Sequence, residues 1–211
     1  MSSPPLLRRA GDRAVLVEPG DAERLARLRA SLAASTPDLV TDWVVGARTV
    51  LLTFDGPPDL AGLEREVASR MAQAAPASHS SPSDVLTIPV RYDGPDLDDV
   101  ARLLALTPEE VIAAHTGTEW VCRFIGFAPG FGYLSADGEP PFRLPRRTQS
   151  RPVVPAGSVA LADEYTAVYP RRSPGGWQLI GTTDLPVWDA ARTPPNAIAP
   201  GTRVRFVRAE P

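Results

Sequence analysis

One short run, Phe124–Leu134, restricts the fold of this chain more than any other segment. It reads FIGFAPGFGYL, with three glycines, one proline and four aromatic rings. In a helix interior glycine costs about 1 kcal/mol and proline about 3 kcal/mol, and Pro129 cannot donate a hydrogen bond within a central strand. The run is nevertheless too apolar for an ordinary surface loop. We therefore predict a buried or half-buried turn, in which Gly130 and Gly132 allow positive φ angles or close backbone contact.

The composition argues against several kinds of chemistry. All 22 basic residues of the 211-residue chain are arginine, so this chain cannot supply a P-loop lysine, a Schiff-base lysine or a lysine that carries biotin. A single cysteine, Cys122, excludes an internal disulfide. With only two histidines, a zinc site of the usual His/Cys type is not expected. The net charge of -3 gives no general basic surface for nucleic acid.

The sequence also lacks membrane and export signals. No segment approaches the roughly 18 apolar residues of a membrane-spanning helix. The first residues, MSSPPLLRRAGDR, do not show the basic and then apolar pattern of a secretory signal. We therefore expect a cytoplasmic protein without nucleic-acid or membrane partners, a location that the single cysteine also fits.

The first part of the sequence alternates between strand and helix patterns. Residues 13–18 alternate as a strand does, and Asp21 is placed to cap a helix with leucines at helical spacing. VTDWVVG and TVLLTF form a predicted hairpin, and residues 57–74 form a second amphipathic helix. A β-α-β-β-α order followed by a further strand predicts a ferredoxin-like domain over residues 1–84.

A linker is predicted between two domains. Residues 75–84, which include His79, are rich in proline and serine and poor in large apolar side chains. The following run, VLTIPVRY, is strand-like and either completes the first sheet or opens the second domain.

The second domain is predicted over residues 85–211. It begins with two short helices, Leu97–Leu104 and Pro108–His115, and Thr107 is placed to cap the second. From Trp120 onward, short β segments separated by proline and glycine predict a β-barrel or β-sandwich.

Arginines and turns in the second half offer sites for anions. A guanidinium suits carboxylate or phosphate, although a solvated basic face gives the same pattern. PAGS and SPGG place backbone amides beside hydroxyls, as anion-binding nests do, but ordinary turns share this composition. No nucleophile elbow or Walker A run is present. The six arginines of this region are 143, 146, 147, 151, 171 and 172.

Three runs, in this order, resemble the family of the 5-oxoprolinase B subunit, which includes KipI-type kinase inhibitors and allophanate hydrolase subunit 1. They are FIGFAPGFGYL, PRRTQSRPVVPAGSVALA and YPRRSPGGWQLIG, within Val111–Thr183. The resemblance implies a carboxyltransferase domain with subdomains C and D. Its fold class is α+β, with an N-terminal ferredoxin-like α/β domain and a C-terminal cyclophilin-like β-barrel. The glycine–aromatic turn would line a cleft of that barrel or its contact with a partner.

The resemblance implies one component of an ATP-dependent hydrolase that opens the cyclic amide 5-oxoproline to glutamate, inactive on its own. The implied partners are a protein similar to the A subunit of 5-oxoprolinase and a protein similar to its C subunit, which is also allophanate hydrolase subunit 2-like. ATP is the implied cofactor, on this chain or on a partner, and any biotin would arrive on another chain. The alternatives are a KipI-type inhibitor of a sensor histidine kinase and a carboxyltransferase subunit of allophanate hydrolase or urea carboxylase type. Peptidyl-prolyl isomerisation rests on the barrel fold alone.

Carried over to this sequence, the motifs give a set of candidate residues and no metal site. The predicted catalytic residues are His115, Arg146 and Arg151, the last as a clamp for carboxylate or phosphate. His115 also fits a purely structural residue at a helix end, before Gly117 as a C-cap. The predicted substrate-binding residues are Gly130, Gly132, Pro155, Gly157, Ser158, Tyr169, Ser173, Gly175, Gly176 and Trp177.

The chain departs from the family pattern in two of these runs. ADEYTAVYP stands where the family reads AGxQTGIYP, so Asp163, Tyr165 and Ala167 replace glycine, glutamine and glycine. Thr182 replaces the arginine of the family's IGRT. The loss of a polar glutamine and an arginine leaves the choice of substrate open.

Overall fold

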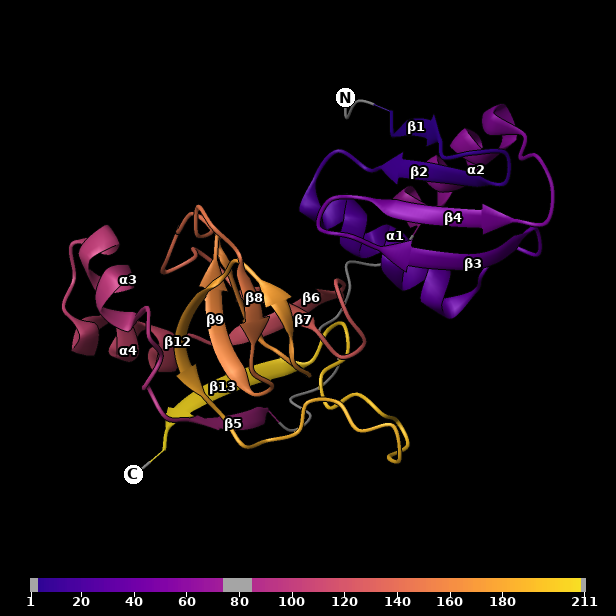
Figure 1. Ribbon diagram of the computed structural model, residues 1–211. Helices are drawn as coiled ribbons and strands as arrows, with labels where there is room; N and C mark the ends of the chain where they lie inside the picture. The colour runs from indigo at the N-terminus through magenta and orange to yellow at the C-terminus, as the bar shows by residue number, and fades with distance from the viewer. Residues whose placement is uncertain (1–3, 74–84, 210–211) are drawn as a thin grey trace. The chain divides into compact units, whose positions relative to one another are not determined.

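The computed structural model describes residues 4–73 and 85–209, and the chain divides into two compact units, Met1–Ser83 and Asp84–Pro211 (Figure 1). The first unit combines a sheet with helices, and the second is built around a barrel-like sheet. The predicted linker over 75–84, with His79, and the predicted boundary that follows it lie outside the described residues.

The first unit is a four-stranded antiparallel sheet with helices packed on one face. Asp21 caps the first helix as predicted, because its carboxylate accepts a hydrogen bond from the Arg24 N–H at 2.8 Å. Leucines of both helices face the sheet and form the core with its valines. The strands lie in the order β1, β2, β4, β3, and the elements are β1 (Leu6–Arg9), β2 (Ala14–Glu18), α1 (Ala22–Ala34), β3 (Val40–Val45), β4 (Val50–Phe54) and α2 (Leu60–Gln73).

The strand predicted to follow the second helix does not complete this sheet. The edge position beside β2 is taken by β1, whose Leu7 pairs with Val17 and packs against the core of the unit. The strand in VLTIPVRY is β5 (Leu86–Val90), which belongs to the second unit because Ile88 and Val90 are buried in the barrel core. The ferredoxin-like description of the first unit is therefore not confirmed.

The second unit contains a seven-stranded sheet that curves into a nearly closed barrel (Figure 1). Neighbouring strands are antiparallel, except for the parallel pair β13 and β5. The two end strands meet because Arg91, after β5, and Thr182, in β12, exchange backbone hydrogen bonds of 2.8 Å. In spatial order the strands are β12 (Gln178–Thr182), β9 (Ser158–Ala162), β10 (Tyr165–Val168), β7 (Gly132–Ala136), β6 (Trp120–Ile125), β13 (Arg203–Arg208) and β5.

The seam of the barrel continues beyond Arg91 to Asp96. The N–H groups of Gly94 and Asp96 donate to carbonyls of β12, at 3.3 and 3.0 Å. A Cβ on Gly94 would lie 2.3 Å from the Leu179 carbonyl oxygen, so only glycine allows the chain to approach the strand this closely. This approach fixes Asp96 against the barrel wall.

Helices α3 (Leu97–Leu104) and α4 (Pro108–Gly117) follow the seam, and α3 has its predicted bounds. The predicted cap of α4 is confirmed, since Thr107 and Glu110 form a reciprocal capping box. The prediction of Gly117 as C-cap is wrong, because the helix includes Gly117 and ends on Thr118. The Trp120 indole N–H donates to the His115 carbonyl at 3.0 Å, and this bond satisfies a last-turn carbonyl without a left-handed glycine.

Two sets of side chains pack on the two faces of the barrel sheet. Successive residues of a strand point to opposite faces, so in β9 Val159 and Leu161 join the barrel core while Ala160 and Ala162 face outward. The outward face also packs against Val154 of a small two-stranded sheet and against aromatic rings. The small sheet pairs β8 (Arg151–Val154) with β11 (Ser173–Gly175).

Candidate functional site

The glycine–aromatic run forms the turn between β6 and β7, which confirms the predicted turn. Gly130 has a φ of 77°, and a Cβ there would lie 2.7 Å from Cβ of Trp188. A Cβ on Gly132 would lie 2.9 Å from Cγ2 of Ile198. Both glycines therefore allow close packing, and Gly130 also supplies a left-handed backbone.

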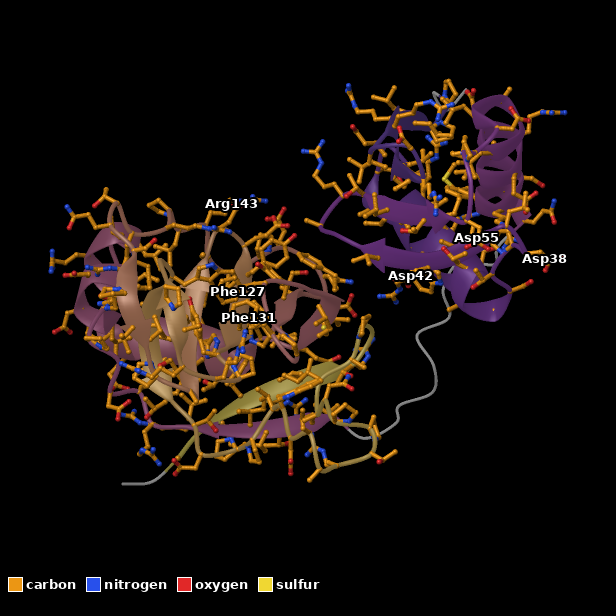
Figure 2. The ribbon with its side chains drawn as sticks, turned by 45° about the vertical axis from the view of Figure 1, so that its right-hand side comes forward. Asp38, Asp42, Asp55, Phe127, Phe131 and Arg143 are labelled. Carbon is orange, nitrogen blue, oxygen red and sulfur yellow. The ribbon has the colours of Figure 1, made fainter. Side chains whose placement is uncertain are left out.

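Phe127 stands at the tip of this turn, with a φ of 65° and 59% of its surface exposed. Its ring centroid lies 5.2 Å from that of Phe131 and 6.3 Å from that of Tyr169. Figure 2 labels Phe127 and Phe131, which lie side by side. Phe124 and Phe131 are buried, so the turn presents one largely exposed phenylalanine ring and no broad apolar surface.

The buried rings of the turn belong to a larger group on the outward face of the barrel, which we call the outer aromatic cluster. Alanines form the sheet beneath it, with Ala160 and Ala167 paired across β9 and β10. Their small side chains leave room for rings above the sheet. Phe131 is central, because its ring centroid lies 5.1 to 5.4 Å from those of four other rings. The cluster comprises Phe124, Phe127, Phe131, Tyr133, Tyr165, Tyr169 and Trp177.

Three tyrosines bring hydroxyl groups into this cluster. Burial raises the pKa of Tyr133, Tyr165 and Tyr169, so their phenols stay protonated and can donate hydrogen bonds at neutral pH. Arg146 lies near Tyr133 and Tyr169, and its positive charge opposes the rise of the pKa of both. Arg146 is exposed, and within the described ranges its guanidinium has no ion pair or hydrogen-bond partner.

Arg151 and Arg147 instead converge on one buried carboxylate. Asp96 is only 1% exposed. Arg151 donates to both of its oxygens, at 2.7 and 2.9 Å, and Arg147 donates to Oδ1 at 2.7 Å. The Leu179 N–H adds a fourth bond, to Oδ2, at 2.7 Å. The clamp predicted for Arg151 therefore holds a carboxylate of this chain.

The PAGS turn is part of the barrel wall. Gly157, with a φ of 79°, donates its N–H to the Tyr169 carbonyl and accepts from the Thr183 N–H, both at 2.8 Å. The Ser158 N–H donates to the Pro155 carbonyl at 3.4 Å, and Ser158 is buried. The hydrogen bonds of the Gly157 and Ser158 N–H groups are thus made within the fold, and not by an open anion nest.

The SPGG run, predicted as a turn, instead forms strand β11 over Ser173–Gly175, beside β8 of the arginine-rich segment. Ser173 pairs with Val154 and Gly175 with Arg151, between β11 and β8. A Cβ on Gly175 would lie 2.3 Å from the Tyr169 hydroxyl oxygen. The Gly176 carbonyl accepts a hydrogen bond from the Arg147 N–H at 2.8 Å, and the next residue, Trp177, enters the outer aromatic cluster. Glycine at 175 therefore allows strand β11 to lie against the Tyr169 ring.

His115 lies apart from these groups, inside the barrel end. Its Nδ1 is 2.8 Å from the Tyr92 hydroxyl and its Nε2 is 2.9 Å from the Thr166 hydroxyl. The ring stacks on Phe206, with centroids 4.3 Å apart. His115 is fully buried, and burial lowers its pKa to about 3. Thr166 is flanked in β10 by two residues of the outward face, so His115 contacts the opposite face of that strand.

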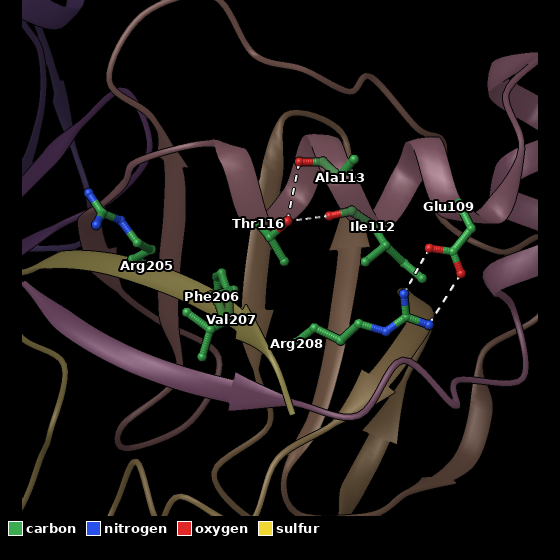
Figure 3. Close-up of a pocket in the computed structure, with 8 residues that line it drawn as sticks. All are labelled: Glu109, Ile112, Ala113, Thr116, Arg205, Phe206, Val207 and Arg208. Carbon is green, nitrogen blue, oxygen red and sulfur yellow. Dashed lines mark hydrogen bonds and ion pairs between the residues drawn. The ribbon is translucent and has the colours of Figure 1, made fainter. Parts of the chain in front are cut away.

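A separate groove lies between α4 and β13 (Figure 3). It has a volume of about 390 Å³, and the bidentate pair of Arg208 and Glu109 lies across one end. The predicted site residues do not line it. Over residues 4–73 and 85–209, no group of three or more His, Cys, Asp or Glu side chains is placed to hold a metal ion, and no helix is long and apolar enough to cross a membrane.

Comparison with known proteins identifies the family. Residues 5–198 match the family described as carboxyltransferase domain, subdomain C and D. The chain belongs to this family. The chain is 42% identical to the B subunit of 5-oxoprolinase from Bacillus subtilis over 149 residues, or 69% of this chain and 61% of that protein. It thus spans about three fifths of that relative's length.

A second relative supports this assignment, and a solved structure shares the fold. The B subunit of 5-oxoprolinase from Escherichia coli O157:H7 is 39% identical over 171 residues, which cover 80% of this chain and 78% of that protein. The solved structure of Kluyveromyces lactis urea carboxylase superposes with a TM-score of 0.77 and covers 99% of this chain and 22% of that one. Its 20% identity shows a shared fold alone.

The departures at Tyr165, Ala167 and Thr182 fall in two places on the second unit. Tyr165 contributes a ring to the outer aromatic cluster, and Ala167 lies beneath it. Thr182 lies at the barrel seam, where its hydroxyl donates to the Asp93 carboxylate at 2.9 Å. The substitution at 165 therefore changes the face that carries the motif residues, and the substitution at 182 does not.

Sequence reasoning missed Asp96 and the central position of Phe131. Asp96 follows Gly94-Pro95 at the start of a predicted helix, where a cap is the ordinary interpretation, but its side chain makes no capping bond. The one signal for Asp96 in the sequence was that the arginine-rich motifs contain no acidic residue to balance their charge. The roles predicted for His115, Arg146 and Arg151 in catalysis stay predictions.

Proposed function

We propose that this chain is a subunit of an ATP-dependent complex that opens the cyclic amide of 5-oxoproline. The observation that supports this most is the 39% identity to the B subunit of 5-oxoprolinase from Escherichia coli, across 78% of that protein. Relatives named as one subunit of an enzyme support a role within a larger assembly. In this proposal the chain has no activity alone, and it works in the cytoplasm with partners that resemble the A and C subunits of 5-oxoprolinase.

The reaction needs ATP because a lactam is a stable amide. Transfer of the γ-phosphoryl group to the amide oxygen gives the ring carbon a leaving group. Water then attacks that carbon and the C–N bond breaks, which leaves γ-glutamyl phosphate and ADP. A second water hydrolyses this acyl phosphate, so that glutamate, ADP and phosphate are the products. ATP is a substrate here. We place it on a partner subunit, since this sequence has no Walker A run and no lysine.

The outer aromatic cluster is the surface of this chain best suited to 5-oxoproline. Arg146 has an unengaged guanidinium beside the cluster, which would bind the substrate carboxylate. The exposed ring of Phe127 and the half-buried Tyr133 would pack against the five-membered ring. The protonated hydroxyls of Tyr133 and Tyr165 would donate to the oxygen on which negative charge develops.

The barrel and its exposed turn fit a role within a complex. We propose that the barrel is of the cyclophilin-like type and that the first unit is a variant of the ferredoxin-like fold. Phe127, at the tip of the turn, would contact the partner that resembles the C subunit, near the substrate, so that the site is completed only on assembly.

A second candidate is a carboxyltransferase subunit of urea carboxylase type. The fold shared with urea carboxylase favours it, as does Tyr165 in place of the family's glutamine, because the change makes the motif face less polar. In that case biotin would arrive on another chain, since this one has no lysine.

Reconstitution tests the proposal. The tagged chain is co-expressed with the candidate A and C subunits, recovered under native conditions and assayed for ATP hydrolysis with and without 5-oxoproline. We expect a complex whose ATP hydrolysis depends on 5-oxoproline and is lost when this chain is omitted. An assembled complex whose ATP hydrolysis does not change when 5-oxoproline is added contradicts the proposal. ATP hydrolysis that depends on urea and a biotinylated carrier would favour the second candidate. Recovery of a sensor histidine kinase with the tagged chain would favour a KipI-type inhibitor.

A further inference from the structure

Arg147 carries a buried hydrogen-bond donor that nothing in the described chain satisfies. Its Nε atom is buried, and among the described residues it is the one buried side-chain nitrogen or oxygen without a partner. Leaving such a donor unpaired costs about 1–3 kcal/mol, and more for a charged group. A buried orphan of this kind is a place where an ordered water, an ion or a ligand completes the hydrogen bonding.

The neighbouring charges do not balance either. Arg147 and Arg151 carry two positive charges, and Asp96 supplies one negative charge. The Asp96 carboxylate already accepts four hydrogen bonds, which is the full capacity of its two oxygens. It cannot also satisfy the rest of Arg147. The cluster therefore keeps one unit of positive charge in a largely buried place, where a further anion would be held strongly.

The free edge of Arg147 has the right geometry for an oxyanion. Its Nη1 atom is bound to Asp96, whereas Nε and Nη2 have no partner in the described ranges. These two nitrogens form one edge of the planar guanidinium, with two parallel N–H groups that match two oxygens of a carboxylate or phosphate. The Arg147 side chain is 31% exposed. Of the two nitrogens on this edge Nε is buried and Nη2 is not, so an anion would approach from the Nη2 side.

The fold holds this guanidinium in one orientation. The Arg147 N–H is anchored on the Gly176 carbonyl at 2.8 Å, and its Nη1 is anchored on Asp96. A Cβ on Gly176 would lie 2.9 Å from the Ser150 hydroxyl oxygen, so glycine lets the segment from Arg147 to Ser150 lie close to this residue. Neither of the two anchoring hydrogen bonds uses Nε or Nη2, so both nitrogens remain available to a ligand.

We propose that the Nε and Nη2 edge of Arg147 is a binding site for an oxyanion, either a carboxylate or a phosphate group. Asp96 and Arg151 orient the guanidinium, and the anion completes its hydrogen bonds. The site is distinct from Arg146, and it can bind an anion in the isolated chain whether or not the assembled complex opens 5-oxoproline.

The test uses the full, isolated chain in a low-salt buffer. The Nε–Hε signal of Arg147, assigned through its own backbone, is followed by NMR while inorganic phosphate or 5-oxoproline is added, and affinities are measured by calorimetry. We expect a saturable shift of this signal with one of the two anions. Arg147→Lys keeps the charge but lacks the two-nitrogen edge, so it should weaken binding by about tenfold or more. Arg172→Lys, at an exposed position, is the matched control and should bind as the wild type does.

Each outcome decides the matter. Saturation by phosphate assigns the site to a phosphoryl group, and saturation by 5-oxoproline assigns it to a carboxylate. If neither anion moves the Arg147 signal, or if both variants lose affinity equally, the site does not exist. Should Arg147→Lys fail to fold, the wild-type titration alone answers the same question.

Discussion

Arg151 holds both oxygens of Asp96, with Nη2 2.7 Å from Oδ1 and Nη1 2.9 Å from Oδ2. Because Asp96 is almost fully buried, removing this partner leaves a carboxylate with only Arg147 to balance it. We expect Arg151→Ala to lower the free energy of unfolding by on the order of 3 kcal/mol. Urea denaturation, followed by far-UV circular dichroism, measures the change.

Arg172→Ala serves as the control, since Arg172 is exposed. Equal stability of the two variants would mean that the pair of Arg151 and Asp96 contributes nothing to folding. Loss of activity in Arg151→Ala must therefore be compared with its stability before it is assigned to substrate binding.

His115 should make the chain less stable in acid. Unfolded histidine titrates near pH 6.5, whereas burial lowers the folded pKa to about 3. Between these values the unfolded state binds a proton that the folded state does not, so the free energy of unfolding falls as the pH drops, by up to about 1.4 kcal/mol per pH unit. Above the unfolded pKa both states are neutral at this residue, and the loss disappears.

Comparison of wild type with His115→Gln isolates this contribution, because other titrating groups are common to both chains. We expect a shallower loss of stability in the variant between about pH 6 and 4, by urea denaturation at each pH. In the assembled complex, the neutral-range pH profile of turnover should not change in this variant. A changed profile would support the general-base role predicted from the sequence.

Gly130 should tolerate substitution poorly. A side chain there needs a positive φ and would clash with Trp188, where a Cβ comes within 2.7 Å. We expect Gly130→Val to cost on the order of 2–3 kcal/mol of unfolding free energy in the barrel unit. The measurement is thermal unfolding followed by circular dichroism, with Gly117→Ala measured in parallel as the control.

Gly117 is the matched control, because a Cβ there meets nothing within 4 Å and lies in a helical turn. Gly117→Ala should leave the melting temperature unchanged or raise it slightly. If Gly130→Val has the same melting temperature as the wild type, the close approach of this turn to Trp188 does not exist in solution.

Arg146 should matter for ligand binding and not for folding. Its guanidinium is exposed and unengaged among the described residues. We expect Arg146→Ala to keep the wild-type melting temperature but to raise the KM for 5-oxoproline in the assembled complex by about tenfold to a hundredfold. Arg171→Ala is the control. An unchanged KM would remove Arg146 from the proposed substrate site.

Local patterns predicted much of the fold. The caps at Asp21 and Thr107 and the bounds of α3 follow from side chains within one helical turn. SVALA forms strand β9 as predicted. Its larger side chains alternate with alanines, and the two sets lie on opposite, buried faces of the sheet. β1 was missed, since LLRR after two prolines carries no alternation, and its partner strand decides its place.

The site was harder to predict because its contacts are distant in the sequence. Arg151 and Asp96 are brought together by the barrel seam, and Gly94 looks like an ordinary turn residue until β12 lies against it. The burial of His115, in helix α4, likewise depends on Phe206 in β13 and Thr166 in β10. The motifs predicted that arginines and aromatic residues lie in this region, but not which arginines are already bound to residues of the chain and which can bind a ligand.

The most direct test of the central claim is the yield of glutamate per ATP consumed. Purified partner subunits are supplied with 5-oxoproline and ATP, with and without this chain, and glutamate and ADP are measured together. We predict that equal amounts of the two products appear only when this chain is present. Glutamate formed at the same rate without it, or ADP formed without glutamate in the complete mixture, would contradict a role for this chain in opening 5-oxoproline.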